Sequence, residues 1–84
     1  MIHELKIKSN YFELVKHEQK KFELRKDDRD FNVGDVLKLN EIDENGNPTG
    51  NYVKRKVMYI LRDCPEYGLQ DGYCILSLGF MREM

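Results

Sequence analysis

The sequence has no long apolar run and no recognisable export signal. No stretch of its 84 residues approaches the ~20 apolar residues that a membrane-spanning helix needs. The opening MIHELKIK lacks the apolar segment of a signal peptide. We therefore expect a cytoplasmic protein without a membrane partner.

Cysteine is scarce, and catalytic or metal-binding motifs are missing. Cys64 and Cys74 are too few for a disulfide framework, and their spacing matches no zinc-ligand pair. We expect both thiols to be reduced, with Cys74 in a strand. His3 and His17 are far apart in sequence, and neither is near a cysteine. No nucleophile elbow or phosphate-binding glycine loop is present, so we predict no metal and no cofactor.

Net charge is also small. Fourteen basic and 15 acidic residues leave a formal charge of −1, so any contact with nucleic acid must come from a local patch. A chain of this length supports one core, which predicts a single domain over residues 1–84. The sequence does not predict an oligomeric state.

A helix is predicted over residues 11–19. Asn10 stands before the helical pattern and Glu13 follows three residues later, as in a capping box. The spacing directs three apolar side chains toward the core: Tyr11, Phe12 and Val15. We expect these aromatic rings to pack in the interior and not to stack on a ligand.

Period-two alternation predicts about five strands. They fall at residues 3–7, 21–25, 36–42, 52–61 and 73–80, and residues 43–51 form a loop. Phe31 and Val33 are expected to enter the interior, and the last strand is apolar on both faces and so central. We predict a mainly β (α+β) fold, a small pseudobarrel with the helix covering one opening.

The stretch KKFELRKDDRD, residues 20–30, holds nine charged side chains. Side chains two apart on a strand project in one direction, so Glu23 and Arg25 must share a surface. Lys20, Glu23 and Arg25 can form a ligand site, in which the Arg fork suits a phosphate or a base edge. The alternative is a surface ion pair, which contributes only about 0 to 1 kcal/mol.

With the helix, the K-x-x-E-x-R strand and a turn ending in V-G-D, the sequence resembles the ASCH domain of the PUA-like superfamily, specifically a small prokaryotic and phage family. The resemblance covers His3 to Ile7, Tyr11-Phe12, Lys20 to Asp35, Val57 to Leu61 and Gly72 to Ser77. The signature is G-x-K-x-x-E-x-R. Glu18 stands at the glycine position, where glycine would end the helix in a left-handed conformation.

The resemblance implies a cleft between helix and barrel lined by the signature residues. ASCH domains have been proposed to bind RNA, and one lineage hydrolyses N4-acetylcytidine with a Lys, a Thr and a Glu. In this chain Glu23 stands where that Thr is expected. Glu23 could serve as a general base only if burial raised its pKa, and the neighbouring cations oppose this.

Two other groups of residues are candidates. Arg29 either ties its turn to a strand, with Asp28 and Asp30 capping amides, or faces a ligand. A basic run, Lys54 to Lys56, follows Tyr52, and Lys54 and Lys56 with this tyrosine can track a phosphate backbone and stack a base. A solvated hairpin is the competing interpretation of that run.

Three functional hypotheses follow. The first is an RNA-binding or nucleotide-binding ASCH domain that uses Lys20, Glu23 and Arg25. The second is a small amidohydrolase acting on modified nucleosides, with Lys20 and Glu23 as its catalytic candidates. The third is a protein-interaction module that uses an exposed sheet edge.

Overall fold

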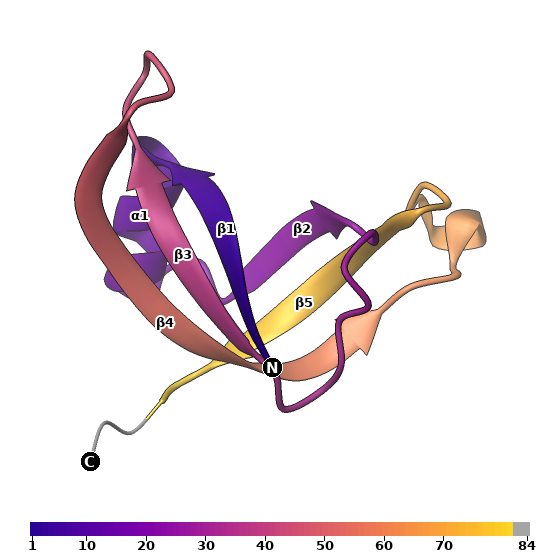
Figure 1. Ribbon diagram of the computed structural model, residues 1–84. Coiled ribbons are helices and arrows are strands. Elements are labelled where there is room, and N and C mark those ends of the chain that lie inside the picture. The colour runs from indigo at the N-terminus through magenta and orange to yellow at the C-terminus, as the bar shows by residue number, and fades with distance from the viewer. Residues whose placement is uncertain (82–84) are drawn as a thin grey trace.

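The computed structural model describes residues 1–81 and shows five strands, one α-helix and one short 3-10 helix (Figure 1). The elements are β1 (Ile2–Lys8), α1 (Ser9–Lys16), β2 (Phe22–Lys26), β3 (Val36–Ile42), β4 (Pro48–Leu61), η1 (Pro65–Tyr67) and β5 (Tyr73–Gly79). The predicted mainly β fold with one helix is confirmed.

All five strands belong to one sheet in the order β1-β3-β4-β5-β2. β1 runs parallel to β3, and the other neighbours are antiparallel. The long strand β4 bends and takes part in both halves of the sheet, which curls into a half-barrel (Figure 1). β1 and β2 are therefore the two edges, and β5 has a neighbour on each side, as predicted.

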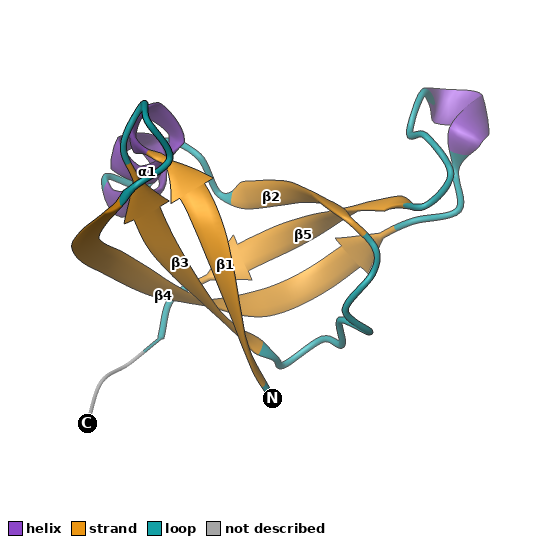
Figure 2. Ribbon diagram, turned by 45° about the horizontal axis from the view of Figure 1, so that its top comes forward, coloured by secondary structure: helices purple, strands orange, loops and turns teal. Residues whose placement is uncertain are grey.

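The core lies on the concave face of this sheet, against α1. The helix follows β1 directly and packs against β1, β3 and β4 (Figure 2). The buried core side chains are Leu5, Ile7, Phe12, Val15, Phe31, Leu37, Leu39, Val57, Cys74 and Leu76. Cys64 and Cys74 are free and buried, and Cys74 lies in β5, the strand in which it was expected. No helix within residues 1–81 is long and apolar enough to cross a bilayer.

The helix starts earlier than predicted and is not capped by Asn10. It begins at Ser9, no side chain caps its first turn, and Ser9 Oγ instead donates to the Ile42 carbonyl at 2.9 Å. Phe12 and Val15 are buried as predicted, but the prediction for Tyr11 was wrong because its side chain is 45% exposed. Of the three side chains assigned to the core, the helix therefore buries only those of Phe12 and Val15.

β2 turns its charged face inward. Glu23 is 3% exposed, whereas Phe22 and Leu24 are 48% and 55% exposed. Ion pairs satisfy the buried carboxylate, so the strand can present its charges to the concave side. Val33, predicted to be interior, is also exposed.

β4 differs from the prediction in its first residue and in an interruption within the strand, and it ends at Leu61 as predicted. It begins at Pro48, so the loop is shorter than residues 43–51. A register shift between Val57 and Tyr59 interrupts the alternation, which is typical of a β-bulge. Val57 is buried but Tyr59 is 62% exposed, so these two residues do not share one face, as uninterrupted alternation over residues 52–61 would require.

α1 ends in a Schellman motif with a glutamate in the glycine position. Gln19 N–H donates to the Leu14 carbonyl at 2.8 Å, and Glu18 N–H donates to the Val15 carbonyl at 3.0 Å. Glu18 has a φ of 63°, in the left-handed region that disfavours residues with a Cβ.

Replacing Glu18 by glycine should therefore stabilise the protein. We expect Glu18→Gly to exceed Glu18→Ala in free energy of unfolding by about 1 kcal/mol, because both lack the carboxylate and only alanine keeps the backbone strain. Urea denaturation measures the difference. An alanine variant as stable as the glycine variant would contradict this explanation.

Candidate functional site

A cavity of about 480 Å³ opens between the free edges of β1 and β2, beside the first turn of α1. We call it the β1–β2 pocket. Its lining residues are Lys6, Ile7, Lys8, Tyr11, Lys20, Phe22, Glu23, Leu24, Arg25 and Lys26. The three residues of the predicted signature therefore lie in one hollow.

Glu23 is the centre of the polar cluster in this pocket. Its Oε1 lies 2.5 Å from Lys20 Nζ, and its Oε2 lies 2.9 Å from Arg25 Nε. The side chains are 4%, 15% and 23% exposed for Glu23, Lys20 and Arg25. One buried carboxylate thus holds two cations at fixed positions, with both of its oxygens used.

The same cations bind backbone carbonyl groups. Arg25 Nη2 donates to the Lys6 carbonyl at 2.6 Å, so the arginine joins β2 to the free edge of β1. Lys20 Nζ donates to the Phe22 carbonyl at 2.9 Å. Within residues 1–81, Arg25 Nη1 and one N–H of Lys20 have no hydrogen-bond partner and can donate to a molecule in the pocket.

The pocket is cationic and has aromatic walls. Five of its side chains are positive and one is negative; the positive ones are Lys6, Lys8, Lys20, Arg25 and Lys26. Lys20 Nζ lies 5.3 Å from the centre of the Tyr11 ring and 4.9 Å from that of Phe22. Such a site favours an anion that carries a flat ring, because cations attract the charge and aromatic faces stack.

Arg29 lies outside this pocket and ties its turn to the sheet. Its Nη1 donates to the Glu4 carbonyl of β1 at 2.9 Å. Asp28 and Asp30 are exposed, and within residues 1–81 neither side chain caps an amide. Of the first alternative, the capping by Asp28 and Asp30 was therefore wrong, whereas the tie between Arg29 and a strand is present. Asp35 caps this turn instead, accepting from Asn32 N–H at 3.0 Å.

The basic run of β4 is divided between the two faces of the sheet. Arg55 points toward the helix and donates to the Val15 carbonyl at 3.2 Å. Tyr52, Lys54 and Lys56 lie on the outer face, and Lys38 Nζ sits 4.5 Å from the centre of the Tyr52 ring. These outer residues do not line the β1–β2 pocket, and their proposed contact with nucleic acid stays a prediction.

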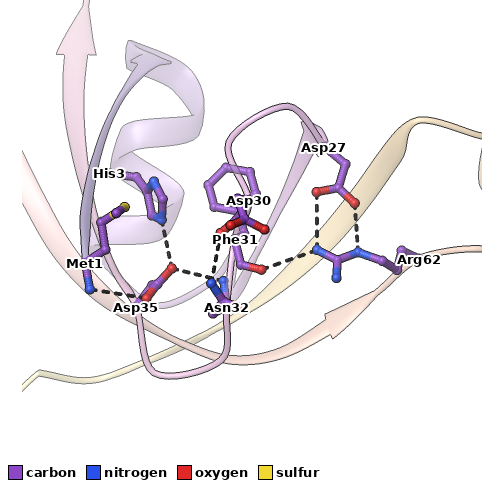
Figure 3. Close-up of polar contacts among 8 residues, drawn as sticks. All are labelled: Met1, His3, Asp27, Asp30, Phe31, Asn32, Asp35 and Arg62. Carbon is purple, nitrogen blue, oxygen red and sulfur yellow. Dashed lines mark hydrogen bonds and ion pairs between the residues drawn. The ribbon is translucent and has the colours of Figure 1, made fainter.

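A second buried polar cluster joins the start of β1 to the turn before β3 (Figure 3). His3 Nε2 lies 2.8 Å from Asp35 Oδ2, and the Met1 amino group lies 3.3 Å from Oδ1. The hydrogen bond with His3, followed by that from Asn32 N–H, lowers the pKa of Asp35 from 3.8 to about 2. The His3 ring also meets the Phe31 ring edge-on. This cluster anchors the turn.

Sequence reasoning missed part of the pocket. Lys6, Lys8 and Lys26 were not singled out, and Tyr11 was assigned to the core. The polar face of β1 carries Lys6 and Lys8 at alternate positions, which is a signal for a shared surface. It does not indicate that β2 lies across from them. Within residues 1–81, no group of three His, Cys, Asp or Glu side chains is placed to hold a metal.

Comparison with known proteins gives one family. The model of a domain of unknown function, DUF3850, matches residues 2–78. No curated protein matches the chain.

Removing the charge of Glu23 should destabilise the fold. We expect Glu23→Gln to reduce the free energy of unfolding by roughly 1–3 kcal/mol, because Lys20 and Arg25 lose the carboxylate that they share. The matched control is Glu4→Gln, whose side chain is 66% exposed and whose ion pair with Lys38 spans 3.7 Å; its change should stay within about 0.5 kcal/mol. Urea denaturation measures both variants. Equal losses in the free energy of unfolding would contradict the conclusion that Glu23 stabilises the fold through its two ion pairs.

The lowered pKa of Asp35 predicts an acid-dependent contribution to stability. The folded-state value of about 2 lies below the ordinary 3.8, so the contribution is complete above about pH 4 and disappears as the pH falls through about 2. Asp35→Asn lacks the ionisable group. Urea denaturation at a series of pH values measures the difference in free energy of unfolding between wild type and this variant. This difference should shrink as the pH falls from about 4 to about 2. A difference that stays constant with pH would contradict the assignment.

Proposed function

Because the chain belongs to the DUF3850 family of domains of unknown function, we propose its function from the β1–β2 pocket: it binds single-stranded RNA or a nucleotide-like ligand there. The observation that carries the proposal is the combination of five cations, two aromatic rings and one buried carboxylate in a single cavity. Phosphate requires the cations, and a base can stack on an aromatic face.

The cations divide into two groups with separate tasks. Lys20 and Arg25 are held by Glu23 and lose little freedom when a ligand arrives. Lys6, Lys8 and Lys26 are exposed, and within residues 1–81 none has an ion-pair partner. The first pair gives a fixed donor arrangement for one phosphate or base edge, and the exposed lysines attract the neighbouring phosphates.

An ASCH relationship is part of this proposal. Lys20, Glu23 and Arg25 occupy the charged positions of the signature and converge in one pocket. Glu18, at the glycine position, has the left-handed φ of 63° that a glycine would adopt freely. Both observations add structural support to a resemblance that was first drawn from sequence spacing.

The proposal can be tested with two matched pairs of lysines. Fluorescence anisotropy with a labelled single-stranded RNA compares wild type, Lys8→Ala/Lys26→Ala in the pocket and Lys54→Ala/Lys56→Ala on the outer face. We expect the pocket variant to lose roughly tenfold in affinity and to lower the slope of log K against log salt by about one to two. The outer-face variant should bind as the wild type does.

Other outcomes are equally informative. If wild type does not bind RNA or a mononucleotide, or if the two double variants weaken equally, the pocket is not the site. If only the outer-face variant weakens, RNA follows Tyr52, Lys54 and Lys56 instead. Lys20→Ala/Arg25→Ala, examined at two salt concentrations, tests the fixed pair after circular dichroism confirms its fold.

The hydrolase alternative has less support. Lys20 Nζ already donates to the Glu23 carboxylate and the Phe22 carbonyl, so it is not free to act as a nucleophile. Both oxygens of Glu23 are occupied by cations. Incubation with N4-acetylcytidine, followed by chromatography, should show no product above buffer; turnover lost in Lys20→Ala would favour the hydrolase.

A further inference from the structure

We infer that the outer face of the β4–β5–β2 half of the sheet docks with a second copy of this chain. This face is mainly apolar and exposed, and it adjoins the β1–β2 pocket at Phe22 and Leu24, which also line that pocket. Its residues, which we call the outer apolar face, are Phe22, Leu24, Met58, Tyr59, Leu61, Tyr73 and Ile75.

The strand register assembles this face into adjacent rows. Tyr59 pairs with Ser77, which pairs with Phe22 on its other side. In the next row Leu61 pairs with Ile75, which pairs with Leu24. The two rows form one continuous surface across three strands, because side chains of directly paired residues point to the same side.

Further apolar side chains extend the rows at both ends. Tyr73 lies on β5 two residues before Ile75, pairs with Lys26 of β2 and is 36% exposed. Met58, at the bulge, is 52% exposed and covers Gly79, where an added Cβ would come within 2.6 Å of Met58 Cγ. The bulge therefore places Met58 on this face. It also turns the side chains of Tyr59 and Leu61 from the inner to the outer face of the sheet.

The exposed area approaches that of a protein interface. Six of these side chains, those of Phe22, Leu24, Met58, Tyr59, Leu61 and Tyr73, are 36% to 62% exposed. Together they present on the order of 600 Å² per chain, close to the ~800 Å² that each partner contributes to a standard interface.

Charges of opposite sign flank the face at the two ends of β4. Lys54 and Lys56 precede it along the outer side of the strand. Beyond its other end the exposed acids Asp63, Glu66 and Asp71 outnumber the cations, which are Lys26, paired in register with Tyr73, and Arg62, whose charge is paired with Asp27. Figure 1 places η1 at the end of the molecule away from α1.

This arrangement selects a second copy as the partner. A two-fold axis that lies in the plane of contact, at the centre of the outer apolar face, places this patch of one chain against the same patch of the other. The antiparallel placement of the two β4 strands sets the basic end of each chain against the acidic end of the other. Each copy therefore supplies both the apolar surface and the complementary charge.

Sedimentation equilibrium of the full chain tests the inference. We expect wild type to approach twice the chain mass of 10.0 kDa as its concentration rises, with a dissociation constant on the order of micromolar. Tyr59→Glu and Leu61→Glu should each weaken association at least tenfold. Val33→Glu is the matched control, since Val33 is 62% exposed and lies outside the face, and it should associate as wild type does.

Charge reversal tests the two-fold arrangement. Lys54→Glu/Lys56→Glu makes both ends acidic, and Glu66→Lys/Asp71→Lys makes both ends basic, so each variant alone should associate weakly. An equimolar mixture should regain association, because the acidic and basic ends then meet twice. Circular dichroism confirms that each variant is folded.

A wild type that stays monomeric at every concentration would overturn the inference, and the partner of this face would then be a different protein. Association that the Tyr59 and Leu61 substitutions do not change, or a mixture no stronger than its components, would also overturn it. The inference does not depend on the ligand of the β1–β2 pocket, because association is measured without RNA.

Discussion

The arrangement of the pocket depends on one buried carboxylate. Glu23 is enclosed on the concave side of an edge strand, where an unpaired charge would be strongly unfavourable. Lys20 and Arg25 neutralise it, and each donates a further hydrogen bond to a backbone carbonyl, of β2 and of β1 respectively. The charged side chains of β2 therefore do not simply face solvent, because through Arg25 they connect the free edge of β2 to that of β1. The same contacts leave both cations rigid and partly accessible, which is what a binding site for an anion requires.

The free edge of β1 is covered in part by side chains from β2 and the turn that follows it. Arg25 and Arg29 donate to successive outward carbonyls of β1, those of Lys6 and Glu4. These bonds occupy acceptors that could otherwise pair with a strand of another molecule. The edge is thus protected, whereas the outer apolar face is not. For this reason the surface best suited to another protein is a face of the sheet and not the edge that the interaction hypothesis first named.

Local patterns predicted the elements well but not always the side on which they are buried. The alternation of His3, Leu5 and Ile7 was correct in strand and in face, because an uninterrupted period of two leaves one apolar side. The alternation in β2 predicted the strand correctly, but the charged side chains and not the apolar ones face the interior. The ion pairs of Glu23 with Arg25 in the same strand and with Lys20 before it allow this burial, and the periodicity does not show that the charged side faces the interior. The bulge after Val57 likewise changes the face of Tyr59 and Leu61 without a local signal.

By itself, the sequence determined the strand and helix inventory, the central place of β5 and the shared surface of Glu23 and Arg25, since all three follow from short-range periodicity and composition. Only the tertiary structure decided that Lys6, Lys8 and Tyr11 line the same pocket, that Tyr52, Lys54 and Lys56 lie on the opposite face, and that apolar side chains of β2, β4 and β5 adjoin. These relations arise from strand order and the curl of the sheet. Both depend on contacts between residues far apart in the chain, which no local pattern specifies.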